Sequence, residues 1–201
     1  MPTTVLDVPR RPSRSVPTVV IPGWQRSEPG HWQLWLAEQL VTAGRDVRHP
    51  ALDVESPDLA SWLVALRASL EGLPPGEFDV VAHSLGAVLW LHHVATAHEC
   101  PRAGRVLLVA PPSPQTTIAE IAAFFPPPMD VDTVRRGADG TVLVGTSDDS
   151  YTPEGVAAAY GRPLKMPATI IEGGGHLNVD SGYGQWPAVL DWCGRDNLAF
   201  F

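Results

Sequence analysis

Cysteine, basic residues and long apolar runs are all scarce in this chain of 201 residues. The two cysteines, Cys100 and Cys193, are too few for a disulfide framework and lack the spacing of a metal site, which predicts structural thiols in a reducing cytoplasm. A net charge of −8 argues against nucleic acid or an anionic membrane as the partner, because both bind clustered Lys and Arg. No apolar run approaches the roughly 18 residues that cross a bilayer.

The first 15 residues contain three arginines, Arg10, Arg11 and Arg14, but no apolar stretch behind them. A secretory signal needs such a stretch, so we expect this segment to be a flexible tail instead. Residues 16–201 are then expected to form one domain, a length that suffices for a real core. These features together predict a cytoplasmic protein.

Apolar runs typical of strands alternate with helical patterns after the tail. Strands are expected at residues 16–21, 78–83, 106–110, 141–144 and 168–171, with a weak edge strand at 45–50. Helices are expected at 29–44, 56–72 (with Ser56 as N-cap), 86–97, 153–160 and 185–193. Because the strand runs are continuous in Val, Leu and Ile, both faces of each strand should be buried. The pattern predicts an α/β fold, a three-layer α/β/α sandwich with a mostly parallel sheet of about six strands.

Residues 111–137 interrupt this alternation with a proline-rich segment. It is long for a simple connection and short for a separate cap domain. Its apolar residues Ile118, Ile121, Phe124 and Phe125 either cover the mouth of a site or pack a surface excursion. Both interpretations remain open at this stage.

The most informative stretch runs from an expected strand through Ser84 into an expected helix. The residues two before and two after this serine are small, Ala82 and Gly86, as a tight strand-to-helix turn requires. Such a nucleophile elbow lifts the serine hydroxyl above the sheet edge and aims the helix N-terminus at what it attacks. The pattern therefore predicts Ser84 as a nucleophile.

A carboxylate and a histidine follow later strands, in the chain order that this chemistry needs. The fourth long strand is followed by Asp148 and Asp149, and the fifth by three glycines and His176. The glycines would form a mobile loop that can bring His176 over Ser84. A serine hydroxyl needs a base beside it, and a carboxylate must orient that base, so His176 and Asp149 are predicted to fill these roles. Asp149 is preferred because a proline follows it at the usual spacing, and Asp148 is the alternative.

Two backbone donors are needed to stabilise the oxyanion that forms when a carbonyl is attacked. The N–H of Leu85, directly after the nucleophile, is predicted to be one of them. The loop after the first strand should supply the other, for which we favour the N–H of Trp24.

The remaining histidines do not form a metal site. His92, His93 and His98 are one, five and six residues apart and do not match the i, i+4 spacing of a zinc helix. His83 is expected to pack or to support the site, and His31 is either a substrate contact or a helix residue. Neither a metal nor a cofactor is expected.

The chain resembles the retinoblastoma-binding protein nine (YdeN-like) family of small serine hydrolases. The resembling segments are 22–27 with His31 and Trp32, 81–86, 109–112, 147–149 and 173–178, spread over most of the chain. The resemblance implies a compact α/β-hydrolase fold without a separate cap domain, with a catalytic triad at Ser84, Asp149 and His176. This sequence offers nothing that points to the partner after which the family is named.

The sequence thus predicts a cofactor-free serine hydrolase that cleaves a small-molecule ester through an acyl-enzyme, in preference to an amide or a thioester. A binding protein that uses the same cleft for a ligand or protein partner is the alternative, and a lyase on the same fold is a third. Substrate identity and oligomeric state are left open.

Overall fold

The computed structural model describes residues 15–25, 29–96 and 101–201. Its strands are β1 (Thr18–Ile21), β2 (Val47–Arg48), β3 (Asp79–His83), β4 (Ala103–Val109), β5 (Ala138–Thr146) and β6 (Ala168–Ile171). They form one six-stranded sheet in the order β2-β1-β3-β4-β5-β6, and every pair of neighbours is parallel. The predicted parallel sheet is confirmed, including the weak strand within residues 45–50, which lies at one edge. Residues 1–14 of the predicted tail lie outside the described residues.

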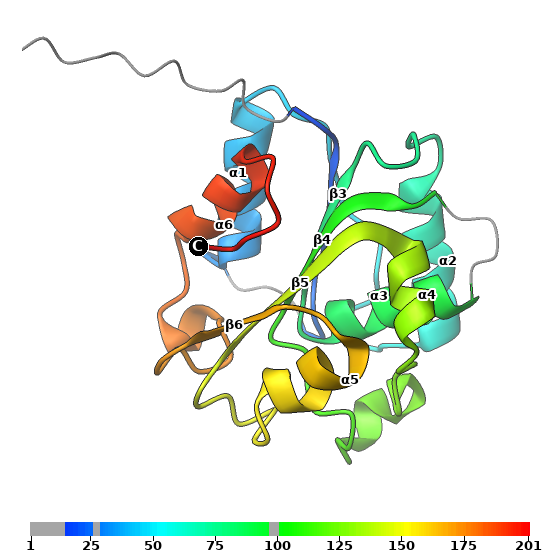
Figure 1. The fold of residues 1–201 in the computed structure, drawn as a ribbon, viewed down its shortest axis with the longest axis vertical. Helices are drawn as coiled ribbons and strands as arrows, with labels where there is room; N and C mark the ends of the chain where they lie inside the picture. Colours follow the sequence, from blue (N-terminus) through cyan, green and yellow to red (C-terminus); the bar gives the residue numbers. More distant parts are fainter. Residues whose placement is uncertain (1–14, 26–28, 97–100) are drawn as a thin grey trace, which may run out of the picture.

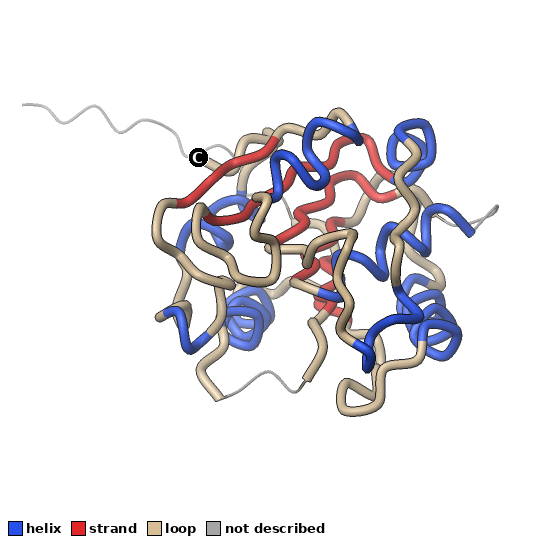
Figure 2. Tube along the Cα trace, turned by 90° about the horizontal axis from the view of Figure 1, so that it is seen from below, coloured by secondary structure: helices blue, strands red, loops and turns tan. Residues whose placement is uncertain are grey.

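Helices cover both faces of this sheet (Figures 1 and 2). On one face lie α1 (Trp32–Thr42) and α6 (Pro187–Gly194), and on the other lie α2 (Leu59–Leu70), α3 (Leu85–Thr96) and α4 (Val131–Gly137). The strand order reverses direction between β1 and β3, because β1 leads outward to β2 while β3 leads to β4. The ends of β1 and β3 therefore meet at a topological switch point, where α/β proteins place their sites.

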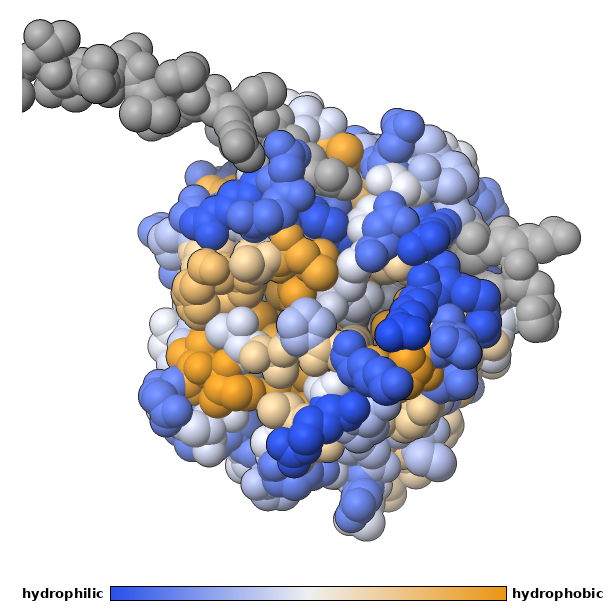
Figure 3. Space-filling view, in the orientation of Figure 1, coloured by the Kyte–Doolittle hydropathy of each residue, from blue (hydrophilic) through white to orange (hydrophobic). Residues whose placement is uncertain are grey.

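Two hydrophobic layers form the core, one on each face of the sheet. Val80 and Ala82 of β3 pack with α2 and α3, whereas Val81 between them packs with α1 and α6. This alternation follows from the two-residue period of a strand. It explains why the strands read as continuous apolar runs. At the sheet edge formed by β6, residues alternate between exposed and half-buried. The surface in Figure 3 shows hydrophobic patches between hydrophilic regions.

Several helix boundaries differ from the sequence prediction. Asp58, not Ser56, caps α2, because its carboxylate accepts from the N–H of Ser61 at 2.8 Å. The helix expected at 153–160 begins after Pro153 and continues as a π-helical turn (Ala157–Gly161) into α5 (Arg162–Leu164). Pro153 and Gly155, whose φ is +75°, keep the preceding residues out of the helix.

Residues 111–137 contain helix that the sequence analysis did not predict. A 3-10 helix (Ala119–Phe124) and α4 both fall in this segment. Phe124 is fully buried and meets Trp62 of α2 edge to face, with ring centroids 5.1 Å apart. Ile121 is also buried, and it lines the cavity described below. Each interpretation of this segment thus holds for one side chain, since Phe124 packs against α2 and Ile121 lines the cavity.

The last part of the chain packs against α1. The short 3-10 helix Val179–Ser181 precedes α6, which begins at Pro187, two residues later than expected.

Cys193 is buried, and burial raises the pKa of its thiol to about 12, in keeping with a structural thiol. Cys100 and His98 lie outside the described residues. Among the residues that the structure describes, no helix is long and apolar enough to cross a membrane.

A buried ion pair ties the sheet to the C-terminal segment. Asp79 at the start of β3 is fully buried and accepts from Arg105 of β4, with Nε 3.2 Å from Oδ1. Nη1 of the same arginine donates to the carbonyls of Trp192, Arg195 and Asn197 at 2.7–3.0 Å. Arg45 approaches the same carboxylate at 3.8 Å. The carboxylate of Asp79 is thus the counterion for Arg105 and Arg45, whose guanidinium groups donate to carbonyls of α6 and of the residues after it.

Asp79→Asn is expected to lower the free energy of unfolding by about 3–5 kcal/mol, because it leaves buried guanidinium charge without its counterion. Asp139 is the matched control, since it pairs with Arg102 at 3.0 Å on the surface. Asp139→Asn should cost less than about 1 kcal/mol. Urea unfolding of both variants measures the difference, and equal costs would contradict this interpretation of the buried pair.

Candidate active site

Ser84 lies on the turn between β3 and α3 with a left-handed backbone. Its φ is +53°, a conformation that is uncommon for residues other than glycine. Its N–H donates to the carbonyl of Val109 at the end of β4, at 2.8 Å, which holds the turn against the neighbouring strand. This is the geometry of a nucleophile elbow, with the serine hydroxyl at the carboxyl edge of the sheet.

The turn is possible only because Gly86 has no side chain. A Cβ at this position would lie 2.3 Å from the carbonyl oxygen of Pro22 and 2.8 Å from that of Ile21. On the other side of the serine, Ala82 is completely buried in the sheet. Gly23 completes the contact, since a Cβ there would lie 2.9 Å from the Cβ of Ser84. The loop after β1 and the elbow after β3 are therefore packed backbone to backbone.

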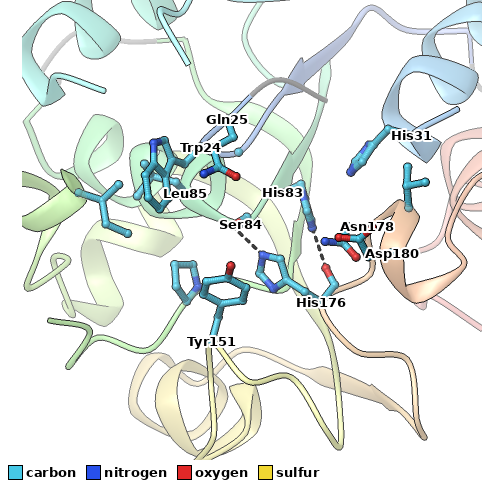
Figure 4. Close-up of a pocket in the computed structure, with 14 residues that line it drawn as sticks. Trp24, Gln25, His31, His83, Ser84, Leu85, Tyr151, His176, Asn178 and Asp180 are labelled. Carbon is cyan, nitrogen blue, oxygen red and sulfur yellow. Dashed lines mark hydrogen bonds between the residues drawn. The ribbon is translucent and has the colours of Figure 1, made fainter. Parts of the chain in front are cut away.

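The structure brings Ser84, His176 and Asp149 together in one line. Nε2 of His176 lies 2.9 Å from Oγ of Ser84, a hydrogen bond drawn as a dashed line in Figure 4. Its Nδ1 lies 2.9 Å from Oδ2 of Asp149. A carboxylate can only accept, so Nδ1 carries the proton and Nε2 presents its lone pair to the serine hydroxyl. This arrangement can take a proton from Ser84 without any rearrangement.

The two neighbouring aspartates make different contacts. Asp149 is buried, and its second oxygen, Oδ1, accepts from the N–H of Tyr151 at 2.9 Å. Asp148 turns away from the imidazole, and its Oδ1 accepts from the N–H of Gly175 at 2.8 Å. Asp149 thus meets the ring of His176, whereas Asp148 holds the backbone that leads to it.

Hydrogen bonds hold the loop of His176 in place over the serine. Ser147 accepts from the N–H of Gly173 at 3.2 Å, and Thr146 donates to the carbonyl of Gly175 at 2.5 Å. His83 donates from Nε2 to the carbonyl of His176 itself at 3.0 Å, which gives His83 the supporting position that its sequence neighbours suggested. The imidazole therefore lies over Ser84 without the loop movement that the three glycines led us to expect.

Trp24 and Leu85 both line the cavity in front of Ser84. Leu85 is the first residue of α3, so its N–H has no acceptor within the helix. The N–H of Trp24 donates to no residue in the described part of the chain. Both amides are therefore available to a ligand atom near Ser84. Arg26 and Ser27, which belong to the resembling segment, lie outside the described residues.

His83 lies beside His176, and His31 lies beside His83; both are neutral at pH 7. The ring of His83 lies 5.1 Å from that of His176 and 5.2 Å from that of His31. Burial, with a smaller effect from the charge of His176, lowers the pKa of His31 to about 4 and that of His83 well below its usual range. The other described histidines lie elsewhere; His92, for example, binds the carbonyl of Phe124 at 2.8 Å. No cluster suited to a metal ion is found among the described residues.

The cavity has a volume of about 140 Å³ and includes residues to which the sequence analysis gave no role. Asn178, Val179 and Asp180 line it from the segment after His176. Asn178 belongs to the resembling segment, which was the one signal available for it. Asp180 had no sequence signal, because its place follows from the path of the chain after His176.

The serine hydrolase family matches residues 18–194 of this sequence. The chain belongs to the serine hydrolase family. Within the α/β-hydrolase fold it is similar to the ydeN gene product of B. subtilis, with 20% identity, a TM-score of 0.74, and coverage of 88% of this chain and 95% of that one. No match to the sequence was found among curated proteins.

Two further solved structures show the same fold at low identity. A YdeN-like protein from Pectobacterium atrosepticum is 21% identical over 89% of each chain, with a TM-score of 0.63. A carboxylesterase from Nitrososphaera gargenis is 15% identical over 81% of this chain and 84% of its own, with a TM-score of 0.55. The predicted serine hydrolase family and the α/β-hydrolase fold are thus confirmed, with YdeN-like proteins among the structures that share this fold.

Gly86→Ala is expected to destabilise the protein by about 1–3 kcal/mol, because the added methyl group must push the elbow away from the loop after β1. Gly194→Ala is the control, since a Cβ at Gly194 would meet no atom within 4 Å. The control should change stability by less than about 0.5 kcal/mol. Chemical unfolding of both variants tests this, and a stable Gly86→Ala protein would contradict the close contact.

Proposed function

We propose that this serine hydrolase is an esterase that cleaves small carboxylic esters through an acyl-enzyme. The observation that carries the proposal is the line of hydrogen bonds from Asp149 through His176 to Ser84, at 2.9 Å in each step. It ends at a cavity large enough for a short acyl group. The likeness to a carboxylesterase extends only to the fold, so the choice of an ester rests on the site.

In the first half of the reaction, Nε2 of His176 takes the proton of Ser84 while Oγ attacks the ester carbonyl carbon. The carbonyl oxygen becomes an anion, and the N–H groups of Trp24 and Leu85 donate to it. The C–O bond to the alcohol then breaks, and His176 returns its proton to the leaving oxygen. The acyl group remains on Ser84.

In the second half, a water molecule gives a proton to His176 and attacks the acyl carbon. The bond to Oγ breaks, the proton returns to Ser84, and the carboxylic acid leaves. Asp149 holds the Nδ1–H tautomer and stabilises the imidazolium in both halves. Since His31 and His83 are neutral at pH 7, no neighbouring imidazolium opposes this charge.

The role of Ser84 is tested with a fluorophosphonate probe, which reacts with activated serines. The wild-type protein should be labelled, and Ser84→Ala should not be labelled and should lose turnover of p-nitrophenyl esters. Ser150→Ala is a suitable control, because Ser150 lies beside the triad in sequence but contributes no side-chain contact to it. Equal labelling of wild type and Ser84→Ala would overturn the assignment, and labelling without turnover would favour a binding protein.

The two aspartates are distinguished by matched amide variants. Asp149→Asn should lower kcat by roughly three to four orders of magnitude, because the amide no longer fixes the productive tautomer of His176. Asp148→Asn should cost less than about tenfold, since an amide oxygen still accepts from Gly175. Steady-state kinetics on one p-nitrophenyl ester measures both, and the reverse order would exchange the two roles.

A further inference from the structure

The cavity beside Ser84 is lined by both apolar and polar side chains. Trp24, Leu85 and the amide of Gln25 lie on one side of the serine in Figure 4, and Pro112, Ile121 and Tyr151 also line the cavity. On the other side lie His31, Asn178 and Asp180, which we call the polar wall. Catalysis, as proposed above, uses none of the polar wall's side chains. Their presence therefore points to recognition of the substrate.

His31 presents a hydrogen-bond donor to this cavity. Its side chain caps α1, where Nδ1 accepts from the N–H of Gln33 at 3.2 Å. Because the buried ring is neutral at pH 7, the proton is on Nε2. Nε2 donates to no residue in the described part of the chain, and it is not a fully buried atom, so its N–H can donate to a ligand in the cavity.

Asn178 and Asp180 add a second donor and an acceptor. Oδ1 of Asn178 accepts from the N–H of Ser181 at 3.1 Å and from its hydroxyl at 2.9 Å, which fixes the amide and leaves its NH₂ group to donate. Asp180 provides a carboxylate that can accept. The polar wall thus combines donors with an acceptor over a short span.

This combination matches hydroxyl groups, each of which both accepts and donates a hydrogen bond. An anionic group would be repelled by Asp180, and the described residues that line the cavity include no Lys or Arg to balance it. A cationic group would face the donors of His31 and Asn178. A neutral, hydroxylated group is the chemistry that fits all three side chains.

His176, which in the proposed mechanism gives its proton to the leaving oxygen, is followed on the same segment by Asn178 and Asp180. A leaving alcohol beside the polar wall would place the acyl group toward Trp24 and Ile121. We propose that the polar wall binds the alcohol portion of the substrate and that this portion carries free hydroxyl groups, as in a monoester of a polyol. This inference rests on the proposed esterase function.

Two esters with the same acyl group and the same carbon chain test the proposal. They are 2,3-dihydroxypropyl butanoate and propyl butanoate, which differ only in two hydroxyl groups. For the wild-type protein we expect kcat/KM to be about five- to tenfold higher for the dihydroxypropyl ester, the effect of one or two net hydrogen bonds.

Two variants then locate this preference. His31→Asn keeps a good N-cap for α1 but withdraws the donor from the cavity, and Asp180→Ala removes the acceptor without touching a cap. Each should reduce the preference to within about twofold of unity. Leu34→Gln, on the exposed face of α1, is the control and should keep the preference.

The possible results separate the two proposals. Ser84-dependent turnover of both esters without a preference, or a preference that survives in both variants, would overturn the polar wall and leave the esterase function intact. Absence of Ser84-dependent turnover of any ester would overturn both.

Discussion

The site depends on a contact between two stretches of backbone. Gly86 lies so close to the carbonyls of Ile21 and Pro22 that no side chain fits between them. This contact is available because β1 and β3 are neighbours in the sheet although α1, β2 and α2 separate them in sequence. The same contact places the loop of Trp24 beside Ser84. Nucleophile and anion-stabilising backbone are thus positioned together, before any catalytic side chain is considered.

The arrangement of charge around His176 follows from burial. One carboxylate, Asp149, is held against Nδ1 within the protein interior. Burial lowers the pKa of the imidazoles of His31 and His83, so that both are neutral at pH 7. They therefore act as neutral hydrogen-bonding groups, one toward the carbonyl of His176 and one toward α1 and the cavity. Of the three neighbouring histidines His31, His83 and His176, only His176 is therefore positioned to act as a base toward Ser84.

The sequence predicted those parts of the fold and site that local chemistry determines. Buried strands, the elbow at Ser84, and the histidine and aspartate at later strand ends all have signals within a few residues. The cap at Asp58 was missed because Ser56 is equally suited to that position by type, and only the path of the chain selects between them. Phe124 and Ile121 could not be assigned, since their partners Trp62 and the cavity are remote in sequence. His31 was considered as a substrate contact, but Asn178 and Asp180 were not placed beside it, because the three side chains line one cavity only in the folded chain.

The hydrogen-bond ladder of the sheet continues one residue past its strands. Ser84 donates to Val109, and Ala110, which is also left-handed, donates to Val144. Because both bonds extend the central sheet, we expect these amides to open at a higher cost in free energy than those of the surrounding loops. The polar wall stands on a helix cap and a single 3-10 turn, which open at lower cost in free energy. Local fluctuations can therefore broaden what this protein accepts while the reacting group keeps its geometry.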